Sequence, residues 1–332
     1  MAEPATLKNG AAHRRRPGLG DLLDSSAGRN LGLVAVLLIL GIVGVATADT
    51  FLTTSNLLTI LTSASIIGVI TVGVTFVIIG GGIDLSVGKV MALASVWATT
   101  VATQAYGPFV MILCALAVGT GAGLVNGLLI AYGRIVPFIV TLAALITAQG
   151  LAEQISGRRS QIVTDPTITS IATTRVLGVP LLVFIFAAVV AIGWVVLNRT
   201  TFGRRTFAIG GNPEAARLAG VDVKRHTAAL YALSGLCCGI AAIMIASLTT
   251  TGSSTHGTLY ELDAIAAVII GGTLLSGGRG TLIGSILGVL VFTVITNLFV
   301  LNNLATEVQN IAKGVIIVVA VLIQARARRS SA

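Results

Sequence analysis

Apolar runs long enough to cross a lipid bilayer recur along this chain from Leu31 to Ile323. One helical crossing needs about 20 consecutive, mostly apolar residues. Of the 332 residues, 55% are hydrophobic and only 10% are charged, whereas soluble domains usually carry about 25% charged residues. The runs occupy nearly the whole chain, so they predict an all-α, polytopic membrane protein without a soluble catalytic domain.

About ten transmembrane helices are predicted from this pattern. They cover residues 31–49, 58–79, 86–105, 108–130, 136–156, 179–197, 227–250, 262–274, 281–300 and 309–325. We expect a disordered tail over residues 1–28, a single transmembrane domain over 29–325 and a short tail over 326–332. An uncleaved first helix is favoured over a signal peptide because its apolar run begins far from the N-terminus.

Basic residues are distributed unevenly around these helices. In the predicted topology, 17 of the 21 Lys and Arg residues, Lys89 among them, flank the same side of the membrane. The positive-inside rule assigns that side to the cytoplasm, together with both termini and the loop over residues 198–226. The net charge of +9 is explained by this topology. Nucleic-acid binding is not expected, because the basic segments contain no interleaved aromatic residues.

The sequence contains no motif for catalysis or for binding a cofactor. A Walker A loop needs four residues between its glycines and a Ser or Thr after the Lys, whereas Gly88-Lys89 follows Gly82 by a longer gap and precedes Val90. The three cysteines all lie in apolar segments, and the three histidines are far apart. We therefore expect no disulfide framework, no metal site, no catalytic residue and no bound ATP in this chain.

A carboxylate interrupts the apolar pattern in GGGIDLSVGKVMALAS, residues 80–95. The glycines before Asp84 permit a broken helix. Two compatible interpretations follow for Asp84. It caps the following helix by accepting backbone N–H bonds, or it lines a substrate path, as acids at membrane depth usually do.

A second interruption, IIGGTLLSGGRGTLIGS over residues 269–285, resembles the first. Both contain Ile-Ile-Gly-Gly, then Leu-Ser, then a basic residue. Paired glycine breaks in the two halves of a membrane protein indicate a transport site between internal repeats. Broken or re-entrant segments are therefore predicted near residues 80–86 and 272–280.

The 198–226 loop contains a predicted helix of about two turns. Its residues are Asn212, Pro213, Glu214, Ala215, Ala216, Arg217 and Gly220. Asn212 is a favourable N-cap, Pro213 suits the first helical position and Gly220 suits the C-terminal cap. A helix this short is marginal in water. Either the membrane edge of the same protein or docking into another protein must hold it.

Four segments together resemble the permeases of bacterial ribose-, xylose- and galactose-type ABC importers. They are GGGIDLSVG, NGLLIAYGRIVPFIVTLAALITAQGLA, FGRRTFAIGGNPEAARLAGVDVKRH and ELDAIAAVIIGGTLLSGGRGT. The resemblance covers roughly residues 30–325. It implies two permease subunits, here expected to be a homodimer, in the bacterial inner membrane. It also implies a periplasmic sugar-binding protein and a cytoplasmic ATPase that binds ATP and Mg and is coupled to the pore through the helix over residues 212–220.

On this resemblance, the chain is expected to be a non-enzymatic subunit that moves a monosaccharide by alternating access. Candidate path residues carry hydroxyl, amide or carboxylate groups, and they are Asp84, Ser86, Asn126, Thr141 and Asn297. A permease of the same superfamily for branched-chain amino acids is an alternative. Two further alternatives are an ion-coupled transporter and a passive channel. An ion-coupled transporter should have intramembrane acids that form an ion site. Neither an ion-coupled transporter nor a channel gives the capped helix a role.

Overall fold

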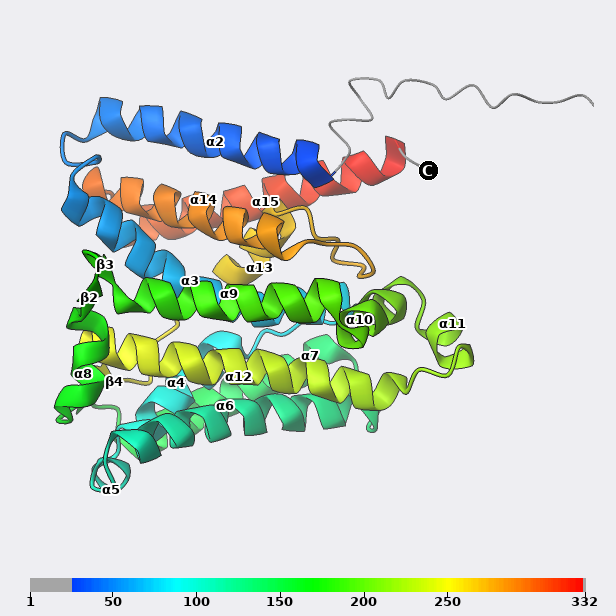
Figure 1. Cartoon of the computed structure of the whole chain (residues 1–332), viewed down its shortest axis with the longest axis horizontal. Helices are drawn as coiled ribbons and strands as arrows, with labels where there is room; N and C mark the ends of the chain where they lie inside the picture. Colours follow the sequence, from blue (N-terminus) through cyan, green and yellow to red (C-terminus); the bar gives the residue numbers. More distant parts are fainter. Residues whose placement is uncertain (1–25, 331–332) are drawn as a thin grey trace, which may run out of the picture.

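The computed structural model describes the backbone of residues 26–330 and, among these, the burial of Gly28 and of residues 30–322. Most of the tail predicted over residues 1–28 therefore lies outside the described residues. Helix α15 (Thr306–Ser330) continues through most of the tail predicted over residues 326–332. The long helices run side by side along one direction (Figure 1).

The remaining helices follow in chain order. They are α2 (Ser26–Thr47), α3 (Thr54–Ile79), α4 (Val87–Ala98), α5 (Val101–Gln104), α6 (Pro108–Ala131), α7 (Pro137–Ser156), α8 (Pro166–Thr173), α9 (Leu181–Arg199), α10 (Thr201–Gly211), α11 (Pro213–Leu218), α12 (Val223–Thr249), α13 (Tyr260–Ile270) and α14 (Leu282–Leu301). Two antiparallel pairs of two-residue strands join β1 (Gln161–Ile162) to β4 (Thr251–Gly252) and β2 (Arg175–Val176) to β3 (Val179–Pro180).

Among the described residues, seven helices are long and apolar enough to cross a membrane, namely α2, α3, α6, α7, α9, α12 and α14. Every predicted crossing contains a helix, but α4 and α13 have only 12 and 11 residues. The predicted number of ten crossings is therefore not confirmed. Both short helices adjoin the interruptions that the sequence predicts, since α4 follows the first and α13 precedes the second.

The centre of the bundle is formed by α3 and α12, whose apolar segments are largely buried by the other helices. Helix α6 packs closely against α12 because glycines remove the side chains between them. A Cβ on Gly123 would lie 3.0 Å from the Cα of Gly235, and a Cβ on Gly119 would lie 2.7 Å from the backbone nitrogen of Gly239. Small residues permit this close approach of helix backbones in membranes.

The two glycine breaks have the same backbone conformation where the preceding helix ends. Gly80 and Gly271 are the C-caps of α3 and α13, and both have right-handed helical backbone angles. The next glycines, Gly81 and Gly272, are left-handed with φ of +84° and +82°. In both breaks these glycines and the residues after them donate backbone hydrogen bonds to the last helical carbonyls. This Schellman-type ending favours glycine, because left-handed φ is strained for other residues.

The molecule has two distinct ends (Figure 1). Helices α10 and α11, the start of α2 and the end of α15 lie at one end, whereas α5, α8 and the strands lie at the other. The sequence groups Lys89 with the basic residues on the side of α11, but the structure does not place it among the exposed basic residues there. Its side chain is buried, and its Nζ donates a hydrogen bond of 3.0 Å to Thr258 Oγ1 in the loop after α12.

Candidate functional site

The first break is held in place around Asp84, which is buried between α3 and α4. Its Oδ1 accepts hydrogen bonds from the backbone N–H of Ser86 at 3.0 Å and from the Ser86 hydroxyl at 2.6 Å. Its Oδ2 accepts one from the Ser234 hydroxyl of α12 at 2.9 Å. The N-cap residue of α4 is Ser86 rather than Asp84, and Ser86 makes no side-chain capping bond. Asp84 thus stabilises the turn before the helix.

Two further predicted path residues surround the same segment. Asn126 of α6 donates from its Nδ2 to Ser86 Oγ at 3.0 Å. The Thr141 hydroxyl of α7 donates to the Pro137 carbonyl of its own helix at 3.0 Å and lies 3.5 Å from the carbonyl oxygen of Ile83. Asp84, Ser86, Asn126 and Thr141 are therefore brought together, all of them buried. Asn126 of α6 and Thr141 of α7 thus contact the segment between α3 and α4, which contains Asp84 and Ser86.

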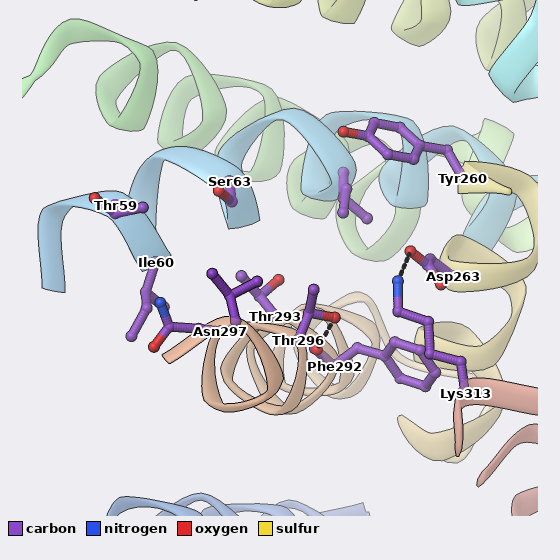
Figure 2. A pocket seen from close by; sticks show the side chains of 12 residues that line it. Thr59, Ile60, Ser63, Tyr260, Asp263, Phe292, Thr293, Thr296, Asn297 and Lys313 are labelled. Atoms are coloured by element: carbon purple, nitrogen blue, oxygen red, sulfur yellow. Dashed lines mark hydrogen bonds and ion pairs between the residues drawn. The ribbon is translucent and has the colours of Figure 1, made fainter. Parts of the chain in front are cut away.

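The fifth predicted path residue, Asn297, lies elsewhere. It is on α14, and its side-chain amide exchanges two hydrogen bonds with Asn56 of α3, at 2.7 and 3.1 Å. Asn297 lines a pocket of about 240 Å³ between α3 and α14, which we call the α3–α14 pocket (Figure 2). Its other lining residues are Thr59, Ile60, Ser63, Ile67, Tyr260, Asp263, Phe292, Thr293, Thr296, Val300 and Lys313.

An ion pair closes one side of the α3–α14 pocket. The Nζ of Lys313 on α15 lies 3.0 Å from Asp263 Oδ2 on α13, and both side chains are largely buried. Tyr260 projects beside them from the same helix as Asp263 (Figure 2). The sequence interpretation did not assign these residues to a path. One sequence signal for the pocket is the four-residue spacing of Thr59 and Ser63 within an apolar helix, because residues at this spacing lie on the same helix face.

The short helix α11 has the predicted caps. The Asn212 side chain accepts hydrogen bonds from the backbone N–H groups of Glu214 and Ala215 at 3.1 and 3.0 Å. Pro213 is the first helical residue. Gly220 follows the helix with a left-handed φ of +83°.

Only part of the α11 surface is available to a partner. The Ala216 side chain is 4% exposed and therefore faces the protein, whereas Ala215 is exposed and Leu218 is 75% exposed. Arg217 and Glu214 form a two-point ion pair on the surface, with distances of 2.6 and 3.1 Å. Hydrogen bonding to Arg217 lowers the pKa of Glu214, so both groups are charged at neutral pH. Ala215 is therefore available to a partner, whereas Ala216 is not.

Both glycine breaks meet the end of α10, which directly precedes α11. The backbone N–H of Gly278 donates to the Ile79 carbonyl at 2.9 Å. A Cβ built on Gly277 would lie 2.8 Å from the Cα of Gly81, and one built on Gly210 would lie 2.6 Å from the nitrogen of Gly278. We call this contact of α10 with both breaks the glycine junction. It leaves no space for side chains at these positions.

A second pocket, of about 320 Å³, adjoins the glycine junction at the α11 end. Its lining includes Gly80, Gly81, Gly82, Gly210, Pro213 and Tyr231. Tyr231 of α12 donates its hydroxyl to the Ile83 carbonyl at 3.1 Å, and so fixes the break beside this pocket. Pockets therefore occur towards opposite ends of the helix bundle.

Residues 56–321 match the family described as "Branched-chain amino acid transport system / permease component". The ribose import permease protein RbsC of Bacillus subtilis is 37% identical to this chain, covering 88% of the chain and 90% of that protein. RbsC of Escherichia coli is 36% identical over 88% of the chain and 92% of its own length. The galactose/methyl galactoside import permease protein MglC of Escherichia coli is 37% identical, with coverages of 87% and 92%. No solved structure matches the chain.

Proposed function

This chain belongs to the branched-chain amino acid transport system / permease component family, and on that premise we propose that it is the transmembrane subunit of an ABC importer for a monosaccharide. The observation that carries the proposal is the similarity to ribose and galactose import permeases along 87–88% of this chain. The substrate belongs to the class that includes ribose and galactose. The subunit moves it by alternating access and performs no covalent chemistry.

The proposed assembly is supported by the similarity to import permeases of ribose and galactose. A cytoplasmic ATPase binds ATP and Mg, a periplasmic binding protein delivers the sugar, and a second copy of the permease completes the pore in the bacterial inner membrane. Both termini and α11 lie on the cytoplasmic side. Support for this orientation comes from the basic residues near α11 and from Figure 1, where the start of α2 and the end of α15 lie at the α11 end.

Coupling to the ATPase is proposed to pass through α11 and α10. The outward face of α11, with Ala215 and Leu218, docks into the ATPase. Helix α10 directly precedes α11 and contacts both glycine breaks at Gly210. A displacement of α11 would therefore move both breaks, and with them the ends of α3 and α13. Closure of the ATPase would in this way change access to the pocket at the α11 end.

The other candidate functions receive less support. The relatives compared above are named for sugars and not for branched-chain amino acids. An ion-coupled transporter needs a carboxylate that is free to bind the ion. The buried Asp84 and Asp263 accept hydrogen bonds from Ser86, Ser234 and Lys313, whereas the buried Glu261 has one oxygen, Oε2, without a hydrogen-bond partner among the described residues. The similarity to ribose and galactose import permeases therefore disfavours ion coupling more strongly than these contacts do.

The proposal is tested by measuring ATP hydrolysis by a complex of the permease in nanodiscs with its cognate ATPase and binding protein. We expect D-ribose or D-galactose with the binding protein to stimulate hydrolysis several-fold, and the permease to co-purify with the ATPase. L-leucine serves as the control substrate. Stimulation by L-leucine alone, or no stable complex with the ATPase, would contradict the proposal.

A further inference from the structure

The α3–α14 pocket lies in the half of the bundle that is farther from α11. Thr59 and Ser63 belong to the first three turns of α3, which starts at the end opposite α11 (Figure 1). Thr293 and Asn297 belong to the second half of α14, which ends there. With α11 in the cytoplasm, this half faces the side from which an imported substrate enters.

Hydroxyl and amide groups line this pocket although it lies between apolar helices. The Thr293 side chain is 6% exposed, and its Oγ1 has no hydrogen-bond partner among the described residues. Burial of a hydroxyl without a hydrogen-bond partner is unfavourable. Most Thr and Ser hydroxyls on α3, such as those of Thr62 and Thr71, avoid this cost by donating to their own helix. Thr293 Oγ1 thus keeps unused hydrogen-bonding capacity in the wall of the pocket.

The charges in the pocket favour a neutral ligand. Asp263 and Lys313 neutralise each other at 3.0 Å, so neither is free to bind an ion or one end of a zwitterion. The remaining polar groups are neutral, namely the hydroxyls of Thr59, Ser63, Thr293 and Thr296, the phenol of Tyr260 and the amide of Asn297. These donors and acceptors lie beside the aromatic rings of Tyr260 and Phe292, which suits a compact molecule with several hydroxyl groups.

We propose that the α3–α14 pocket binds the hydroxyl groups of a neutral monosaccharide as it passes from the outer side into this subunit. The proposal rests on the proposed function and specifies where the sugar first contacts the chain. Thr293 and Ser63 bind its hydroxyls, and the Asp263–Lys313 pair keeps the pocket neutral. The pocket volume of about 240 Å³ is several times the ~30 Å³ that one water molecule occupies in the liquid, which leaves room for a sugar ring.

The test uses the complete importer in proteoliposomes and follows uptake of labelled D-ribose and D-galactose. The pocket variant is Ser63→Ala with Thr293→Val, which removes two hydroxyls and leaves the ion pair intact. We expect it to lower the uptake rate about tenfold through the loss of two hydrogen bonds, whereas the amount of ATPase that co-purifies with the permease should match that of the wild type. The control variant, Thr62→Val with Thr71→Val, removes two hydroxyls that are bonded within α3. It should transport within about twofold of wild type.

The possible outcomes separate the pocket from the proposed function. Equal uptake by the pocket and control variants, with active wild type, overturns the pocket proposal and leaves the function intact. Failure of the wild-type complex to move any sugar overturns both. If the double variant does not fold, the test is the rate at which a maleimide alkylates a Ser63→Cys variant. D-ribose or D-galactose at saturating concentration should slow this alkylation if the sugar occupies the pocket. An unchanged alkylation rate refutes the proposal.

Discussion

The backbone N–H of Gly278 donates a hydrogen bond to the carbonyl oxygen of Ile79 at 2.9 Å, and so joins the second glycine break to the last residue of α3. Gly210 of α10 fits against the same carbonyl, where any Cβ would collide with the Ile79 oxygen. Two breaks nearly 200 positions apart in the sequence therefore share one contact with the helix that precedes α11. Motion of α11 has a direct route to both breaks.

Replacement of Gly210 by alanine should interrupt this route. In Gly210→Ala the new methyl group meets the Ile79 carbonyl and displaces α10 from the breaks. We expect the ATPase still to bind, because the outward face of α11 is unchanged, and sugar-stimulated hydrolysis to fall at least about tenfold. Gly211→Ala is the matched control, since no atom lies within 4 Å of its Cβ. If both variants couple equally well, the glycine junction does not transmit motion.

The outward face of α11 should determine ATPase binding. Leu218 is 75% exposed, and Leu218→Asp places a charge where we expect an apolar contact. A central apolar contact contributes about 2 kcal/mol or more to a docked interface, so recovery of the ATPase in a pull-down should fall sharply. Leu177→Asp, at a 96% exposed residue in the turn between β2 and β3, is the control. Normal pull-down of the ATPase by Leu218→Asp would show that α11 docks elsewhere.

Ala216→Glu is unsuitable for the same test. Because the Ala216 side chain faces the protein, a glutamate there would detach α11 from its own support. We expect this variant to lower the thermal stability of the isolated permease as well as its coupling. Ala215→Glu, on the exposed side, should leave the thermal stability unchanged. Equal melting temperatures of the two variants in detergent would contradict the inward orientation of Ala216.

Asp84 should contribute to both stability and transport. In Asp84→Ala the Ser234 hydroxyl and the Ser86 N–H lose a buried acceptor. Each unsatisfied group costs about 1–3 kcal/mol. We expect transport per folded molecule to fall more than the yield of folded protein, because the loosened break adjoins the junction with α10. Folded protein is measured by analytical size exclusion and transport by sugar uptake.

Ser234→Ala should show a smaller effect of the same kind, since Asp84 keeps its two bonds to Ser86. Ser247→Ala on the same helix should be nearly neutral. Its hydroxyl is bonded only to the Met244 carbonyl one turn away. Wild-type transport per folded molecule in Asp84→Ala would mean that the break tolerates the loss of its carboxylate.

Sidedness is tested by labelling single cysteines, after the three native cysteines have been replaced. Ala215→Cys lies on α11 and Leu177→Cys at the opposite end of the bundle (Figure 1). We expect an impermeant maleimide added to intact spheroplasts to modify Leu177→Cys but not Ala215→Cys. Permeabilised cells should show modification of both. The reverse pattern in intact spheroplasts would invert the topology.

Local features of the structure were predictable because short sequence motifs determine them. The Ile-Ile-Gly-Gly segments predict helix endings, and the structure has the same left-handed glycine, Gly81 or Gly272, in each. Asn212 and Gly220 predict the ends of α11 by the same logic. These features depend on backbone conformations that only a few residue types adopt readily.

Features that depend on how helices rotate against one another were not predictable. The sequence places Ala216 in the helix that is expected to couple to the ATPase, but its side chain faces the protein. It places Lys89 among the basic residues on the cytoplasmic side, but its side chain is buried beside Thr258. Asn297 was grouped with Asp84 because both are polar residues in apolar segments, yet it pairs with Asn56 at a different site. Hydrophobicity shows that a residue lies in a helix, but packing decides which neighbour it meets.

ATP-driven accumulation of sugar tests the account most directly. Proteoliposomes containing the permease and its ATPase, with binding protein outside and ATP inside, are supplied with labelled D-ribose or D-galactose. We predict accumulation above the external concentration that requires ATP and binding protein, and that persists when ionophores abolish proton and sodium gradients. Accumulation without the ATPase, driven by an imposed ion gradient, would show that this chain is an ion-coupled transporter and would contradict the account.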